Sequence, residues 1–279
     1  MLRTLPDFLL IGAMKCGTTS LHTFLRSHPQ VYMPAHKEIA FFSSATNWHK
    51  GVAWYERFFV DAPHGSVKGE ASTDYTKFPS YAETAERIFE VLPSVKYIYC
   101  VRDPLERMMS HYRHEIARGR EHRPPHRALI EEPMYLAASS YGMQLERHLR
   151  FTQPDRVLIL QAEELRIDRR CAMRAAFGFL GVDVELAGYL DAPDLYTGEE
   201  RLGAMGPALR LAEGQWTGPL RRRLSPGAKR RVRVALRNVT RRDHVEVASE
   251  LSPQFHRVLE ERLAGDQERF AELRRTCHS

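Results

Sequence analysis

The sequence predicts an α/β protein with a parallel central sheet flanked by helices. Short apolar runs alternate with segments whose apolar residues recur at helical spacing, as in strands joined by crossover helices. The first run breaks at a glycine and passes into a hydroxyl-rich helix start, and a later run ends in Arg-Asp-Pro. Open α/β sheets bind ligands at the carboxyl ends of their strands. We therefore expect one domain over residues 1–279, with its site at that edge.

Four apolar runs are predicted to be strands because they are short, continuous and bounded by polar residues. They are residues 8–11, a weak run at Val67, 95–101 and 157–160. Helical spacing predicts helices at 18–26, 81–92, 105–118, 135–151 and 169–180, the last closed by Gly181 as a C-cap. Apolar residues from Leu251 to Phe270 predict a final helix that packs back on the core.

The first strand-to-helix junction predicts a cradle for a phosphate or sulfate group. It reads Gly12-Ala13-Met14-Lys15-Cys16-Gly17-Thr18-Thr19-Ser20. Glycines let backbone N–H groups approach an anion closely, and the hydroxyls lie where the helix dipole favours negative charge. The lysine precedes the second glycine, whereas the nucleotide-triphosphatase loop has it after that glycine. We expect it to neutralise a departing oxygen without Mg²⁺; the alternative is a glycine turn with no ligand.

A second anion site is expected where the run at 95–101 ends in Arg102-Asp103-Pro104. Proline suits the first turn of a helix, which then carries Ser110 two turns later. The Arg102 guanidinium can donate two charge-assisted hydrogen bonds to one phosphate, and the Ser110 hydroxyl adds a neutral donor. A structural ion pair beside a helix start is the alternative for this segment alone. Taken together with the cradle at residues 12–20, the segment from Arg102 to Ser110 indicates a ligand that has two separated anionic groups.

Glu38 is the candidate general base. It lies in His36-Lys37-Glu38-Ile39-Ala40-Phe41-Phe42, where apolar neighbours could desolvate a carboxylate. The alternative is a surface ion pair with the adjacent lysine. His111 and His22 are alternative bases, ranked below Glu38.

Composition limits the partners. The chain has 279 residues and a net charge of +6, which suits an anionic ligand without demanding nucleic acid, and no nucleic-acid-binding motif is evident. Its four cysteines are scattered without metal-ligand spacing, so we expect no metal site and a reducing compartment.

The apolar run at 8–11 is too short to span a membrane and does not read as a signal peptide, so we expect a cytoplasmic protein. The segment 183–250 is variable and basic, and is expected to be either a solvated surface or a lid.

Three of these segments together resemble the sulfotransferases that use 3′-phosphoadenosine 5′-phosphosulfate, in the bacterial and heparan-sulfate-type branch. Residues 15–21 resemble that family's loop for the 5′-phosphosulfate, and residues 101–112 resemble its segment for the 3′-phosphate. Lys37-Glu38 with Phe41-Phe42 resembles the segment that supplies the catalytic glutamate. The resemblance covers roughly residues 5 to 182.

The resemblance implies a P-loop-like sulfotransferase fold and in-line transfer of a sulfuryl group to a hydroxyl, or secondarily an amine. It implies catalytic roles for Glu38 and Lys15. Donor binding would fall to Lys15, Cys16, Gly17, Thr18, Thr19, Ser20, Arg102 and Ser110, and the acceptor would be a small molecule or saccharide-like.

The chain also departs from the heparan-type pattern: Ala71 stands where that branch has a substrate-side lysine. The acceptor and the oligomeric state therefore stay open. The rival interpretations are a nucleotide kinase with an atypical loop and a non-catalytic anion-binding module.

Overall fold

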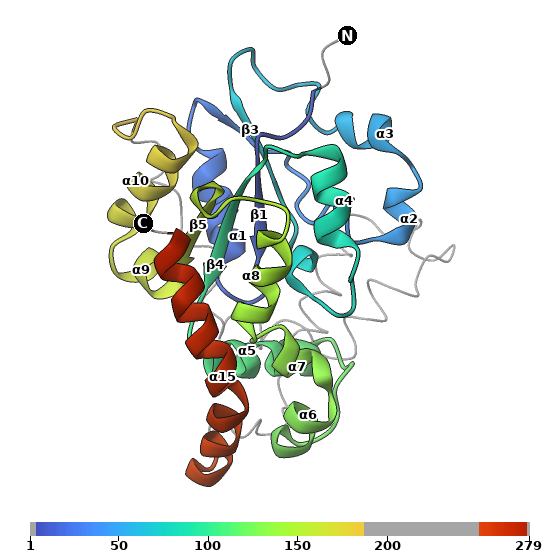
Figure 1. The fold of residues 1–279 in the computed structure, drawn as a ribbon, viewed down its shortest axis with the longest axis vertical. Helices are drawn as coiled ribbons and strands as arrows, with labels where there is room; N and C mark the ends of the chain where they lie inside the picture. Colours follow the sequence, from blue (N-terminus) through green and yellow to red (C-terminus); the bar gives the residue numbers. More distant parts are fainter. Residues whose placement is uncertain (1–3, 187–250, 278–279) are drawn as a thin grey trace, which may run out of the picture.

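The computed structural model describes residues 4–186 and 251–277, which form a five-stranded parallel sheet covered by helices (Figure 1). The strand order is β2-β3-β1-β4-β5. The strands are β1 (Phe8–Gly12), β2 (Val31–Tyr32), β3 (Val67–Ala71), β4 (Lys96–Val101) and β5 (Val157–Gln161). Every strand pairing is parallel, which confirms the predicted fold class.

The central strand β1 is buried along its whole length. It pairs with β3 and β4, with Phe8 opposite Gly69 on one side and Lys96 on the other. A strand covered on both faces must be apolar throughout, which explains the continuous run Phe-Leu-Leu-Ile. A Cβ at Gly69 would lie 2.0 Å from the Phe8 ring, so the glycine provides the space this ring occupies.

Helices connect the strands and cover both faces of the sheet (Figure 1). The first half of the chain contributes α1 (Thr18–Arg26), α2 (Ala45–Trp48), α3 (Val52–Glu56), the 3₁₀ helix η1 (Thr73–Thr76) and α4 (Thr84–Val91). The second half contributes α5 (Pro104–Ala117), α6 (Pro125–Glu131), α7 (Pro133–Ala137), α8 (Tyr141–Leu149), η2 (Pro154–Arg156), α9 (Ala162–Ile167), α10 (Arg169–Leu180) and α15 (Pro253–Cys277).

Most predicted elements are confirmed. The helices at 18–26 and 169–180 have the expected bounds, and Gly181 closes the latter with a φ of 78°. The other two crossover helices shift by one to three residues at their ends. The expected C-terminal helix is α15. The two-residue strand β2 was not expected, because two residues carry no periodic pattern.

The prediction of one helix over 135–151 is wrong, because the chain breaks between α7 and α8. At the break, Ser139 Oγ donates to Pro104 O at 3.0 Å and accepts from the buried Arg107 guanidinium at 2.5 Å. The new helix start exposes backbone N–H groups, and the Asp266 carboxylate accepts those of Gly142 (3.0 Å) and Met143 (2.7 Å). Tertiary contacts from α5 and α15 therefore outweigh the helical periodicity.

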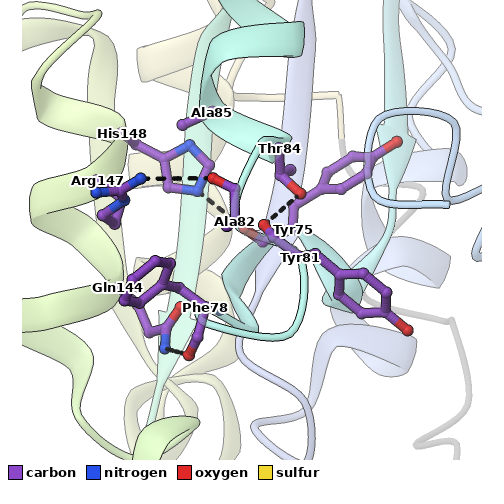
Figure 2. A pocket seen from close by; sticks show the side chains of 9 residues that line it. All are labelled: Tyr75, Phe78, Tyr81, Ala82, Thr84, Ala85, Gln144, Arg147 and His148. Atoms are coloured by element: carbon purple, nitrogen blue, oxygen red, sulfur yellow. Dashed lines mark hydrogen bonds between the residues drawn. The ribbon is translucent and has the colours of Figure 1, made fainter. Parts of the chain in front are cut away.

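Helix α8 also holds the segment that follows β3 (Figure 2). The Gln144 amide donates to Phe78 O and accepts from Phe78 N, both at 2.8 Å, and His148 Nε2 lies 3.0 Å from Tyr75 O. The cavity between these groups measures about 10 Å³, room for one water molecule at most. The hydrogen bonds from α8 hold η1 in place. The cavity between them is too small to be a ligand pocket.

Several expectations fall on residues 187–250, outside the described residues, and the proposed lid is mostly among them. Within residues 4–186 and 251–277, no helix combines the length and the apolar character needed to cross a bilayer. The same residues contain no cluster of three or more His, Cys, Asp or Glu side chains suited to a metal.

We predict that Gly142→Ala lowers the free energy of unfolding by about 1–3 kcal/mol, because overpacking forces the two helices apart. The new Cβ would lie 2.8 Å from Asp266 O and 3.1 Å from Phe270 N, both backbone atoms of α15. The measurement is urea denaturation. The control is Gly265→Ala on the exposed face of α15, where a Cβ meets nothing within 4 Å. This change should raise stability by roughly 0.5–1 kcal/mol. Equal stability of the two variants would contradict the packing argument.

Candidate active site

The loop between β1 and α1 has the geometry of an anion cradle. Gly17 has a φ of 79° and precedes α1, whose first turn contains no acidic residue. The N–H groups of a helix's first turn point out of its amino end, which is the position where helices bind anions. Lys15 has a φ of 73°, which costs a non-glycine residue on the order of 1–3 kcal/mol. Such strain is typical of residues held for a functional purpose.

The Cys16 side chain points away from this cradle and into the core. It is fully buried, and its Sγ lies 3.5 Å from Tyr141 OH. Burial raises the pKa of the thiol to about 11, so it stays protonated at neutral pH. Its backbone carbonyl accepts a hydrogen bond from Cys100 Sγ at 2.9 Å. Cys16 thus shapes the loop from behind, through its side chain and carbonyl.

Glu38 lies in a strained turn beside this loop. Its φ is 63° and that of Ala40 is 51°, both in the left-handed region. The Glu38 carboxylate accepts from Thr73 N at 2.7 Å and from Thr73 Oγ1 at 3.2 Å. The side chain is 40% exposed, so a substrate can reach it. The Thr73 backbone and hydroxyl donors, together with the solvent access, fit a positioned proton acceptor.

Lys37 connects Glu38 to the start of α1, directly after the β1–α1 loop. Its Nζ lies 2.5 Å from Glu38 Oε1 and donates to Thr18 Oγ1 at 3.4 Å. The ion pair between Lys37 and Glu38 that was expected as the alternative is therefore present. Its lysine also contacts Thr18, so the pair lies beside the candidate site. Neither Lys37 nor Thr73 was predicted as a site residue. The sequence signal for Lys37 was its place beside Glu38 in the segment that resembles the catalytic one, and no signal pointed to Thr73, 35 residues away from Glu38.

Arg102 and Ser110 lie on the neighbouring β4–α5 unit, as expected. Asp103 caps α5 by accepting from Glu106 N at 2.8 Å, with Pro104 in the first turn. The Arg102 guanidinium contacts Glu106, yet its Nε is buried without a hydrogen-bond partner among the described residues. A buried donor of this kind calls for an acceptor, and an anion would supply one. In the part of the chain that the structure describes, no hydrogen bond joins the Arg102 side chain to the Ser110 side chain.

The two histidines considered as alternative bases are poorly placed for that task. Burial lowers the pKa of His22 to about 4, and its Nε2 lies 3.2 Å from Pro34 O. Burial and the neighbouring Arg107 guanidinium, 3.4 Å away, lower the pKa of His111 to about 2. Both histidine rings are also buried, whereas the Glu38 side chain is 40% exposed and open to an acceptor, which favours Glu38 as the base.

Comparisons with known proteins agree with this geometry. The family model described as "Sulfotransferase domain" matches residues 5–196. Human bifunctional heparan sulfate N-deacetylase/N-sulfotransferase 2 is 31% identical over 202 residues, covering 64% of this chain and 22% of that protein. The membrane-associated sulfotransferase kil1 of Dictyostelium discoideum is 38% identical over 115 residues, covering 40% of this chain and 23% of that protein. The chain thus spans less than a quarter of the length of these relatives.

Solved structures support the fold. A sulfotransferase from Alicyclobacillus acidocaldarius superposes with a TM-score of 0.68 at 24% identity, over 97% of this chain and 96% of that one. The sulfotransferase domain from the curacin biosynthetic pathway gives 0.53 at 13% identity, over 93% of this chain and 98% of that one. Since the family model covers most of the chain, and the expected loop, base segment and β4–α5 unit lie within the match, this protein belongs to the sulfotransferase family.

Proposed function

We propose that this chain transfers a sulfuryl group from 3′-phosphoadenosine 5′-phosphosulfate to a hydroxyl or amine of a saccharide-like or small-molecule acceptor. The observation that carries the proposal is the chain of contacts from Glu38 through Lys37 to Thr18. It places a carboxylate capable of accepting a proton beside a loop suited to a phosphosulfate. A non-catalytic anion-binding module would not need that carboxylate.

The residues present fit such a donor. The N-terminal turn of α1, from Thr18 through Ser20, offers N–H groups and hydroxyls to the 5′-phosphate, with Gly17 shaping the entry. The buried Nε of Arg102 lacks an acceptor among the described residues, and a 3′-phosphate would provide one. Ser110 would add its hydroxyl there. When bound, the donor would supply the sulfuryl group that the acceptor receives.

Each catalytic side chain has a distinct task. Glu38 accepts the proton of the acceptor hydroxyl or amine as that group attacks, so no cationic product builds up. Lys15 places positive charge at the loop, where negative charge develops on the departing oxygen. Lys37 pairs with Glu38 and keeps the carboxylate beside Thr18. Such a reaction depends on positioning and electrostatics.

The nature of the acceptor is proposed from the relatives. Several are named as heparan sulfate N-deacetylase/N-sulfotransferases. These names support a saccharide acceptor that receives the sulfuryl group on an amine, in addition to an acceptor that receives it on a hydroxyl. The test is transfer of a radiolabelled sulfuryl group to two matched acceptors. One is fully desulfated heparin, with free amines; the other is the same polymer after N-acetylation, with hydroxyls only. Label on the first alone indicates N-transfer, and label on both indicates O-transfer. A phosphoryl transfer from ATP with Mg²⁺ would contradict the proposal.

We predict that Lys15→Ala lowers kcat by on the order of 100-fold, because one preorganised positive group is lost where charge develops. The assay is the release of adenosine 3′,5′-bisphosphate in the presence of acceptor. Lys68→Ala is the matched control, since its ion pair with Asp7 (2.8 Å) lies at the amino end of β3, on the opposite edge of the sheet. A folded Lys15→Ala protein with wild-type turnover would rule out the role.

Glu38→Gln should lower kcat by roughly 10²- to 10⁴-fold and leave donor affinity nearly unchanged, because the amide keeps the shape but cannot accept the proton. The measurement pairs turnover with calorimetric binding of adenosine 3′,5′-bisphosphate. His22→Asn and His111→Asn serve as comparisons and should retain most turnover when folded. If a histidine variant loses turnover and Glu38→Gln does not, the base is misassigned.

A further inference from the structure

Glu70 is a buried carboxyl for which the proposed mechanism has no task. It lies near the end of β3 with 1% of its surface exposed. Its oxygens accept from Tyr55 OH at 2.5 Å, from Tyr75 OH at 2.9 Å and from the Ser72 hydroxyl. Burial raises the pKa of Glu70 to about 7, against the opposing effect of these three donors. Burying a carboxyl among hydroxyl groups costs free energy, so its presence in the core needs a structural or functional explanation.

Ser72 connects Glu70 to the turn that carries Glu38. The Ser72 hydroxyl donates to Glu70 Oε1 and accepts the N–H of Ala40 at 2.8 Å. A hydroxyl has a single proton, so a strong acceptor at Glu70 directs that proton inward. A lone pair then faces the Ala40 amide. Glu70 thus sets the orientation of the hydroxyl that holds this turn.

The turn needs such support because Glu38 and Ala40 both have left-handed backbone angles without being glycines. Glu38 N donates to Ala71 O at 2.8 Å, which ties the turn to the end of β3. The next residue, Phe41, stacks on Tyr55 with ring centroids 4.5 Å apart and planes at 7°. The tyrosine that donates to Glu70 therefore also supports the chain just after the turn.

We propose that Glu70 is a positioning residue for Glu38 that acts through Ser72. It fixes the Ser72 hydroxyl, which holds Ala40 and keeps the Glu38 carboxylate against Thr73 N. The inference rests on the proposed role of Glu38 as the base. Glu70 itself touches neither acceptor nor donor, because it lies beneath the turn in the core.

The primary test is Ser72→Ala, which removes the connection and leaves the Glu70 carboxyl in place. The expected result is a kcat reduced roughly 10- to 100-fold, as for other small misplacements of a reacting group, with unchanged affinity for adenosine 3′,5′-bisphosphate. Faster amide hydrogen exchange is expected in the peptide that spans residues 38–42. Ser43→Ala is the matched control: Ser43 is buried near the turn, and its Oγ has no hydrogen-bond partner within the described residues. That control should match the wild type in all three readouts.

Glu70→Gln provides a second variant. Its amide can accept from Ser72 but presents N–H groups where Tyr55 and Tyr75 now donate, so it should shift kcat and exchange in the same direction as Ser72→Ala. Tyr55→Phe removes one donor to Glu70 and leaves the Ser72 connection, so its effect on kcat should be smaller. A larger effect of Tyr55→Phe than of Ser72→Ala would overturn the route through Ser72.

A double-mutant cycle separates positioning from general stability. Turnover is measured with whichever of the two heparins accepts label, and exchange is measured on the adenosine 3′,5′-bisphosphate complex. In a Glu38→Gln background, Ser72→Ala should cost little further turnover, because there is no base left to position. An equal cost in both backgrounds, or wild-type kcat and exchange in Ser72→Ala, would overturn the inference. Full turnover by Glu38→Gln alone would instead overturn the proposed role of Glu38.

Discussion

The buried central strand β1 is the constraint on which the site depends. It pairs on one side with β3 and on the other with β4, so three neighbouring strands end at the same edge of the sheet. The loop that carries Lys15 follows β1, Thr73 follows β3, and Arg102 follows β4. Lys15 and Arg102, far apart in the sequence, are thereby brought to one edge of the sheet. Parallel pairing thus supplies the architecture that the proposed chemistry requires.

Backbone strain marks the positions where that edge becomes a site. Lys15, Glu38 and Ala40 are the non-glycine residues with positive φ in the described chain, and the first two carry the proposed chemistry. Such conformations persist only where surrounding contacts determine them. For Glu38 these contacts come from Thr73 and Ala71, and for Ala40 the contact comes from Ser72. All three contacting residues lie at or just after the end of β3. The same end of β3 therefore holds the proposed base, Glu38, and contains the buried carboxyl of Glu70.

Sequence reasoning predicted the features that local patterns encode. The four longer strands, the crossover helices and the loop around Gly17 follow from apolar periodicity and from glycine and proline placement. What it missed depends on contacts between distant residues. The break before α8 arises from Arg107 and Asp266, and Glu70 gains the Tyr55 hydroxyl as a donor only when Tyr55 packs against β3. The pairing of Lys37 with Thr18 likewise requires the folded turn. No pattern within a single segment encodes these contacts.

The most direct measurement of the central claim is calorimetric titration with adenosine 3′,5′-bisphosphate, compared with 5′-AMP and with ATP, in the absence of metal. We expect tight binding of the bisphosphate and markedly weaker binding of 5′-AMP, because the buried Arg102 Nε lacks an acceptor among the described residues and a 3′-phosphate would supply one. Equal binding of the bisphosphate and 5′-AMP would contradict the assignment of Arg102. A preference for ATP that appears only with Mg²⁺ would contradict the account as a whole.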